Sequence, residues 1–291
     1  MFKFSMGSIV LGGAMMMLAG PALSAEPQSH AGWKLAVQTY TFNRFTFFEA
    51  VDKVRSLGLR TVEGFAWQKI SPELGNAQLN PGAPAEALDA VSKKLDQAGV
   101  KLVCYYVADF GKNEAEMRKM FAFAKKMGIE VFVAEPKGET LGLLDKLAQE
   151  FGLKIAIHNH PKNPNKPDYT NWDPDQVMKM IRPCSKHVGC CADTGHWIRS
   201  GLDPVTCLKK YQGRLISLHL KDVNKKGPGA HDVPFGTGVG NFKGQLEELN
   251  RQKFTGVIAI EYEHNMENNL PDLRQSVSYY NKIAGNLAPT R

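Results

Sequence analysis

HVGCCADTGHW (residues 187–197) and LISLHLKD (residues 215–222) are two short apolar runs that each end in groups able to bind a metal or move a proton. The first run ends at Asp193, and the second ends at His219 and Lys221. Alternate residues of a β-strand share one face, so one face of the second run is apolar and the other ends in polar groups. Parallel barrel strands deliver such groups to a single rim. The two runs therefore predict neighbouring strands of a barrel.

The rest of the chain repeats this unit, a short apolar run followed by an amphipathic helical pattern. Strands are predicted at 35–40, 61–65, 101–107, 131–136, 154–160, 188–193, 215–222 and 257–263. Helices are predicted near 46–57, 84–98, 113–127, 140–151, 173–181, 202–210, 241–251 and 270–286. Eight alternations predict an α/β protein with one domain, a (β/α)8 TIM barrel. An open doubly wound sheet is the alternative, but it needs a glycine-rich loop after its first strand, and residues 38–42 contain no glycine.

The first 25 residues have a different pattern. Lys3 precedes an apolar run over residues 9–19, and small residues follow as far as Ala25. This order is typical of a secretory signal peptide, and the apolar run is shorter than the about 20 residues of a membrane span. We expect a signal peptide at 1–25, a mature tail at 26–32 and the barrel at 33–291. The expected location is periplasmic or secreted with no membrane association after processing; an uncleaved anchor is the alternative.

Composition and charge narrow the class of partner. The 291 residues are 43% hydrophobic and 22% charged, as in an ordinary globular protein. The formal net charge is +7, but no basic run exceeds two residues. A dispersed excess of this kind is typical of a solvated surface, and we expect no nucleic-acid partner.

The five cysteines match no zinc-ribbon spacing. Cys104, Cys190 and Cys191 lie in apolar runs, where a thiol behaves as a small hydrophobic group. Cys184 and Cys207 are placed nearer the surface by the pattern, where a disulfide between them is an alternative. Free buried thiols are the main expectation.

Five consecutive predicted strands end in carboxylates or imidazoles. If every strand enters the barrel from the same end, the last inward residues face one rim, while residues such as Ile155 and Ile157 face the outer helices. Buried carboxylates are costly unless a cation pairs with them, so the set predicts a site for one divalent cation, Mn2+, Mg2+, Co2+ or Zn2+. The collected groups are Glu135, His158, His160, Asp193, His219, Lys221, Glu261 and Glu263.

Two further features lie in predicted rim loops. Residues 236–240, GTGVG, resemble a phosphate loop, but they lack the lysine and serine of that motif and favour an ordinary rim loop. Trp67 and Trp172 fall in the long loops 66–83 and 161–172, where an aromatic ring either stacks on a sugar or packs in the core. We expect both rings to contact substrate.

The strand-end motifs together resemble the xylose isomerase-like TIM barrel superfamily, and specifically its sugar phosphate isomerase/epimerase branch. The resemblance runs from about Trp33 to Asn286, and its motifs are HNH at 158–160, DTGH at 193–196, LHLKD at 218–222 and IE at 260–261. It implies one divalent cation held by Asp193, His219 and Glu261. Many members carry a glutamate at the end of strand five, where this chain has His158. Glu135 is therefore the expected fourth ligand, with His158 as the alternative.

The implied chemistry is removal of a proton from a carbon beside a carbonyl of a small-molecule sugar or glycoside. His160 is the expected base, because a neutral imidazole accepts a proton near neutral pH. His158 is counted with the catalytic groups, His196 and Glu263 are expected to assist, and Lys221 is expected to hold a substrate oxygen. Return of the proton gives an isomerase or epimerase, whereas loss of a β-substituent gives an exported lyase or hydratase on keto-sugars or 3-keto-glycosides. A non-catalytic carbohydrate-binding barrel is a third reading, and a homo-oligomer stays open.

Overall fold

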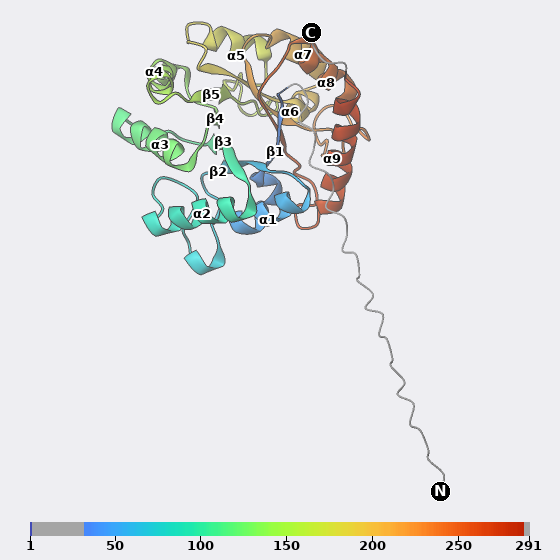
Figure 1. Cartoon of the computed structure of the whole chain (residues 1–291). Helices are drawn as coiled ribbons and strands as arrows, with labels where there is room; N and C mark the ends of the chain where they lie inside the picture. Colours follow the sequence, from blue (N-terminus) through green and yellow to red (C-terminus); the bar gives the residue numbers. More distant parts are fainter. Residues whose placement is uncertain (2–31, 288–291) are drawn as a thin grey trace.

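A computed structural model describes Met1 and residues 32–287. Eight parallel strands close into a barrel, in which each strand pairs with the next and β8 pairs with β1. The helices lie outside the strands, as Figure 1 shows. This confirms the predicted (β/α)8 architecture. The strands are β1 (Lys34–Gln38), β2 (Thr61–Phe65), β3 (Lys101–Val107), β4 (Val131–Ala134), β5 (Lys154–Ile157), β6 (Val188–Asp193), β7 (Leu215–Leu220) and β8 (Val257–Ile260).

The helices follow the strands with one addition to the predicted set, the short helix α6 (Thr194–Arg199) directly after β6. Asp193 starts α6 by accepting a hydrogen bond from the backbone N–H of His196. The other α-helices are α1 (Phe47–Ser56), α2 (Ala85–Ala98), α3 (Glu114–Met127), α4 (Leu141–Phe151), α5 (Pro174–Ile181), α7 (Pro204–Lys210), α8 (Phe242–Arg251) and α9 (Leu270–Gly285). Short 3-10 helices are η1 (Thr39–Phe42), η2 (Pro72–Leu74) and η3 (Gly138–Thr140).

Several strands end earlier than the apolar pattern predicts, which leaves functional groups just beyond the paired sheet. β5, predicted to reach His160, stops at Ile157: the N–H of His158 still donates to the C=O of Ala134 on β4 at 2.9 Å, and the groups after it find other partners. The backbone N–H of His160 donates to the hydroxyl of Tyr169 at 2.5 Å. The side chain of Asn159 replaces the backbone pairing with β6: its Oδ1 accepts from the N–H of Asp193 at 2.9 Å, and its Nδ2 donates to the C=O of Asp193 at 3.1 Å.

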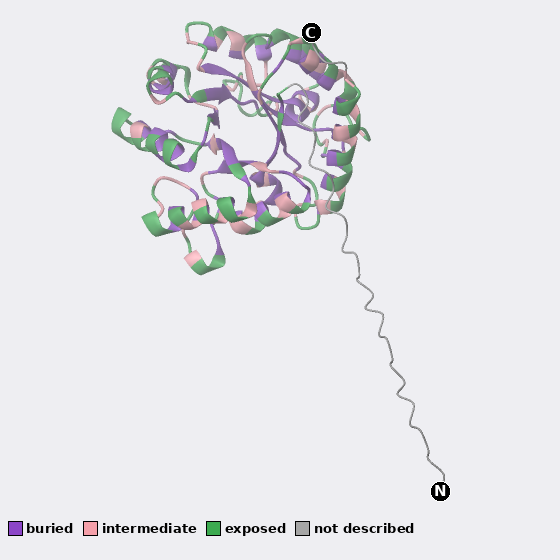
Figure 2. Ribbon diagram, in the orientation of Figure 1, coloured by how far each residue is buried: buried purple, intermediate pink, exposed green. Residues whose placement is uncertain are grey.

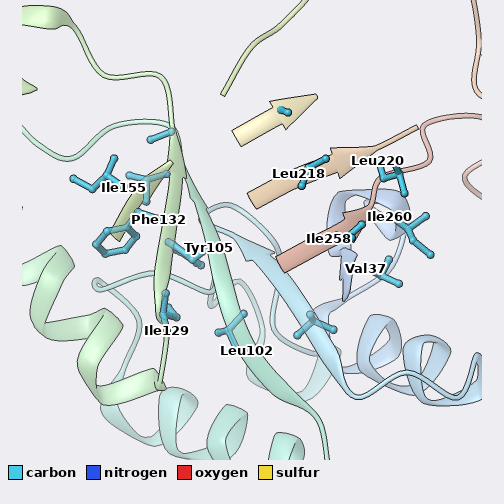
Figure 3. Packing of buried hydrophobic residues seen from close by; sticks show 14 of the residues in the cluster. Val37, Leu102, Tyr105, Ile129, Phe132, Ile155, Leu218, Leu220, Ile258 and Ile260 are labelled. Carbon is cyan, nitrogen blue, oxygen red and sulfur yellow. The ribbon is translucent and has the colours of Figure 1, made fainter. Parts of the chain in front are cut away.

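The barrel separates two layers of apolar side chains. The outward layer packs against the helices, and Figure 3 shows Leu218, Leu220, Ile258 and Ile260 in it. The helices turn their exposed sides to solvent, as the colouring of Figure 2 shows. The inner layer fills the barrel below the rim with small or β-branched groups, so the site rests on a closed floor. Its members are Ala36, Val103, Cys104, Val131, Val133, Ala156, Cys191, Val257 and Ala259.

The glycine-rich loop at 236–240 is a fixed part of the rim. Backbone N–H groups of Gly236, Gly238 and Gly240 donate to the buried carboxylate of Asp222 at 2.9 to 3.0 Å. A Cβ on Gly238 would lie 2.4 Å from Oδ1 of Asp222, so only glycine permits this approach. The protein's own carboxylate occupies these amides, which supports a rim loop over a phosphate cradle.

Asp222→Ala is expected to lower the free energy of unfolding by about 2 kcal/mol, because three loop amides lose a charged acceptor. Chemical denaturation measures this loss. Asp109→Ala is a matched control, since that exposed aspartate accepts only the N–H of Gly111. Equal losses in the two variants would contradict the anchoring role.

The cysteines agree with the sequence-based expectation in their redox state but not all in their position. All five cysteines are free, as expected, but Cys207 is buried at 3% exposure rather than near the surface, because α7 packs it against the core. In the described part of the chain, no helix is long and apolar enough to cross a membrane. The predicted signal peptide and mature tail fall almost entirely on residues 2–31, outside the described residues.

Candidate metal centre and active site

Four buried side chains meet at the rim of the barrel. One nitrogen or oxygen from each of His158, Asp193, His219 and Glu261 lies within 4.8 Å of the others. Oδ2 of Asp193 is 3.6 Å from Nε2 of His158 and 3.8 Å from Nδ1 of His219. Oε2 of Glu261 is 3.1 Å from the same nitrogen of His219. Two imidazoles and two carboxylates at this spacing are a donor set for one divalent cation.

Glu135 lies beside this group and not within it. Its Oε1 is 2.8 Å from Nδ1 of His158 and 2.5 Å from Nδ1 of His160. The structure thus places His158, and not the expected Glu135, with the three other predicted ligands. The reason is position in the barrel: Glu135 follows β4, one strand further from Asp193, and the imidazole of His158 stands between the two carboxylates.

Both histidines of the cluster are oriented by a carboxylate on their other ring nitrogen. Glu63, on β2, bonds Nε2 of His219 at 2.8 Å, and Glu135 bonds Nδ1 of His158. Nε2 of His158 has no hydrogen-bond partner among the described residues, and Nδ1 of His219 and Oδ2 of Asp193 have none there beyond their ion pairs with Glu261 and Lys221, each at 3.1 Å. Buried polar atoms of this kind need a partner, and carboxylate-oriented histidines are the usual surroundings of a metal. The residues present therefore fit a divalent ion.

The charges of the cluster lead to the same conclusion. Burial alone would lower the pKa of His158, but the neighbouring carboxylates of Asp193 and Glu135 raise it to about 10. Burial would raise the pKa of Glu261, but the Lys221 ammonium outweighs it, and the pKa falls well below the ordinary range. The carboxylates are thus charged and are balanced by protons and an ammonium. A divalent ion provides the same compensation once those protons leave.

Lys221 supplies a buried cation at the edge of the cluster. Its Nζ lies 2.5 Å from Oε2 of Glu263, 2.7 Å from Oε2 of Glu261 and 3.1 Å from Oδ2 of Asp193. Its stem passes over Gly195, where an added Cβ would lie 2.7 Å from Cβ of Lys221. The glycine of the DTGH motif is therefore required for the lysine of the LHLKD motif to pass.

His160 and His196 lie next to the cluster and line the adjoining cavity. Their rings stack with centroids 5.1 Å apart. The side chain of His160 is 51% exposed, and Glu135 holds its Nδ1, which leaves Nε2 for a substrate. Burial lowers the pKa of His196 well below its ordinary value, although Asp193 acts in the opposite direction. That imidazole is therefore neutral.

The cavity has a volume of about 150 Å³ and two unlike walls. Histidines and glutamates, including Glu263, form one wall, and aromatic rings form the other. Trp67 is 43% exposed and belongs to the aromatic wall, together with Tyr40, Phe65 and Tyr106. A polar wall facing an aromatic wall is suited to the hydroxyl edges and the apolar face of a sugar.

Trp172 is not among the residues that line this cavity, and its contact with substrate stays a prediction. Its ring instead lies under Nζ of Lys162, 4.7 Å from the centroid, so the loop uses it internally. The sequence reasoning also missed Glu63, Tyr106 and Tyr169. Glu63 carried a usable signal, because it is a charge inside the apolar run TVEGF. Tyr169 lies in an irregular loop and carried none.

Glu63→Gln is expected to weaken metal binding by 10- to 100-fold, the usual cost of removing the carboxylate that orients a histidine ligand. The dissociation constant for Zn2+, measured by competition with a chelator, tests this. Glu130→Gln is the control, because that exposed carboxylate pairs with Lys34 away from the rim. Unchanged affinity in Glu63→Gln would contradict its orienting role.

Known proteins with similar sequences include inosose dehydratases. An inosose dehydratase from Lacticaseibacillus casei is 27% identical over 197 residues, which is 53% of this chain and 64% of that protein. The chain therefore spans less than two thirds of the length of this curated relative.

Solved structures share the fold over a larger part of the chain. An uncharacterised protein from Parabacteroides distasonis is 32% identical, with a TM-score of 0.68 over 86% of this chain and 99% of that one. The IolI protein, crystallised with a zinc atom, has a TM-score of 0.69 over 88% of this chain and 100% of that one, at 16% identity, which shows the fold alone. A family model matches residues 51–283. The chain belongs to the family described by that model, the xylose isomerase-like TIM barrel, as the strand-end motifs predicted.

Proposed function

We propose that this protein is a divalent-metal-dependent enzyme that removes a proton from a carbon beside a carbonyl of a sugar or sugar derivative. The observation that carries the proposal is the cluster of His158, Asp193, His219 and Glu261, with its unpaired buried atoms next to a half-exposed histidine. The match to inosose dehydratases supports this chemistry, and the zinc atom of the IolI structure supports a divalent ion in a barrel of this fold.

The four cluster residues would hold the ion. Two imidazole nitrogens beside two carboxylates favour Zn2+, Co2+ or Mn2+ over Mg2+, which prefers oxygen ligands. When bound, the ion supplies a Lewis acid that stabilises negative charge on substrate oxygens. Lys221 lies behind Glu261 and Glu263 of the cavity lining, and its buried ammonium adds a second positive charge to the cluster.

Proton transfer would take place at His160. Glu135 fixes the ring through Nδ1 and keeps Nε2 facing the cavity. Nε2 would take the proton from carbon, and the adjoining carboxylate would stabilise the resulting imidazolium. Neutral His196, stacked on the same ring, is placed to donate to or accept from a neighbouring hydroxyl. The aromatic wall would hold the apolar face of the sugar and exclude water from it.

His160→Asn is expected to lower turnover about 10²-fold, at the low end for a general base, because water reaches the half-exposed position. Steady-state kinetics with the metal-loaded variant measure this. Metal content is the control, and it should equal that of the native protein, since His160 lies outside the ligand cluster. Loss of metal together with turnover would instead make His160 part of the metal site.

Elimination is the second candidate outcome, and the match to inosose dehydratases favours it over simple epimerisation. In an elimination the base removes the same proton, the C–H electron pair forms a double bond, and a hydroxyl or alkoxyl on the next carbon leaves with a proton. His160 and His196 lie side by side in the cavity lining, so that one imidazole could accept the proton from carbon while the other serves the leaving group.

Solvent deuterium exchange tests the function. The metal-loaded protein is incubated in D2O with an inosose, a ketohexose and a 3-keto-glycoside. We expect deuterium beside the carbonyl of at least one recovered sugar, and none after chelation. Release of water or of a free aglycone selects elimination, whereas a changed stereocentre selects epimerisation. Bound metal without exchange in any substrate would leave a carbohydrate-binding barrel and overturn the proposed function.

A further inference from the structure

We infer that the site continues into a second sugar-binding groove, and that the substrate is a glycoside or disaccharide whose remote ring lies in this groove. The groove is formed by residues 43–49, at the start of α1, and residues 65–69, after β2. The inference rests on the proposed function for the reacting ring, and it adds the identity of the part of the substrate that does not react.

The groove adjoins the catalytic cavity through shared aromatic side chains. Its volume is about 550 Å³, and it shares Tyr40, Phe65 and Trp67 with the cavity lining. The cavity itself, at about 150 Å³, is smaller than the roughly 300–1,000 Å³ of typical ligand sites. The inner hollow therefore takes only part of a ligand of ordinary size, and the larger groove, lined by other residues around the shared aromatic side chains, offers room for the rest.

Trp67 lines both the catalytic cavity and the groove. It is 43% exposed, which is unusual among the large apolar side chains of the described residues. Its ring is held by Phe65 at 4.9 Å, Tyr106 at 6.0 Å and Tyr40 at 6.3 Å between centroids. A fixed, exposed aromatic ring offers a flat apolar surface at little entropic cost, which suits the face of a sugar ring.

The polar groups of the groove have unused hydrogen-bonding capacity. Oδ1 of Asn43 is buried and has no hydrogen-bond partner within residues 32–287. The side chains of Arg44 and Lys69 form no ion pair or hydrogen bond with any described residue, whereas Glu49 is already used by the backbone and hydroxyl of Thr46. The groove lining therefore holds a hydrogen-bond acceptor that lacks a donor, Oδ1 of Asn43, and two donor side chains that lack acceptors among the described residues, Arg44 and Lys69. Sugar hydroxyls meet both needs, because each one donates and accepts.

The groove is also preformed. The backbone N–H of Phe47 donates to the C=O of Lys69 at 2.8 Å, and that of Phe48 donates to the C=O of Ile70 at 3.1 Å. The side chain of Gln68 reaches the C=O of Phe45 at 3.4 Å. These bonds tie the two walls together, so that a ligand meets them already positioned.

Calorimetry on the full-length protein tests the groove directly. Glucose is compared with maltose and cellobiose, for the native protein and for an Asn43→Ala/Arg44→Ala/Lys69→Ala variant, with and without metal. We expect at least one disaccharide to bind about tenfold more tightly than glucose, and the variant to lose that advantage while its glucose affinity is unchanged. Lys166→Ala/Lys225→Ala is the matched control, because those cations lie in rim loops outside both linings.

Several results would overturn the groove. One is that neither disaccharide binds more tightly than glucose, and another is an equal loss of glucose and disaccharide affinity in the variant. Failure of the proposed function is distinguishable: disaccharide binding without deuterium exchange in any sugar rejects the catalysis and keeps the groove. Exchange in free sugars without a disaccharide preference rejects the groove and keeps the catalysis.

Discussion

Asp193→Asn is expected to abolish metal binding and to lower turnover by on the order of 10³-fold, because the Lewis acid contributes several kcal/mol to the transition state. Asparagine keeps the oxygen that starts α6, since Oδ1 of Asp193 accepts the N–H of His196 at 2.7 Å. It replaces the other oxygen, which faces His158 and His219, with an amide that carries no charge. The variant should therefore fold without bound metal. Metal analysis measures the loss of the ion, and steady-state kinetics measure the loss of turnover.

The matched control is Asp203→Asn. Asp203 is an exposed aspartate that starts α7 through the N–H of Thr206 at 2.7 Å, so the same chemical change is made at a helix start far from the rim. It should retain metal and activity. If Asp193→Asn kept its full metal content, the cluster would not be the metal site, and the proposed proton-transfer chemistry would lose its basis.

The sequence was sufficient to predict Asp193, His219 and Glu261 as neighbours. Each lies at the end of an apolar strand in which successive residues face opposite sides of the sheet. Because the sheet closes into a barrel, the inward-facing residues of all strands point to the same interior. Ser217 and His219 point inward while Leu218 and Leu220 point to the helices, as expected from the two-residue period. A property fixed within a single strand is visible in the sequence, because no distant contact decides it.

The choice between Glu135 and His158 was not accessible in this way. Both residues follow strand ends on the inward face, so the two-residue alternation of a strand does not distinguish them. Their roles depend on which side chain stands nearer Asp193 across two strand spacings, and on the contact between Glu135 and both neighbouring imidazoles. Similarly, Glu63 reaches His219 over 156 residues of sequence. Such pairings depend on the closure of the barrel and have no local signature.

Trp67 and Trp172 illustrate the same limit in the loops. Both are aromatic residues in long segments after a strand, and the sequence treats them alike. Trp67 is supported by rings from β2, β3 and η1, and so it faces the cavity. Trp172 has Lys162 of its own loop as its neighbour. The difference arises from the path of each loop, which the composition of the loop does not determine.

Lys221→Met is expected to destabilise the metal-free protein by about 3–5 kcal/mol and the metal-loaded protein by much less. The ammonium is buried at 1% exposure among Asp193, Glu261 and Glu263. Its removal leaves those carboxylates without compensation, which is the costly case for a buried ion pair. A divalent ion bound to two of the same carboxylates restores positive charge. It also binds more tightly when no ammonium repels it, and tighter binding adds stability.

Chemical denaturation with excess chelator, and again with saturating Zn2+, measures both values. Lys210→Met is the matched control, because that lysine pairs with Asp175 at 2.6 Å on the surface and should cost less than about 1 kcal/mol in either condition. An equal deficit with and without Zn2+ would mean that lysine and metal do not share the same carboxylates. A deficit that Zn2+ removes would instead show that one set of oxygens serves two cations, and that the lysine sets how strongly the protein holds its metal.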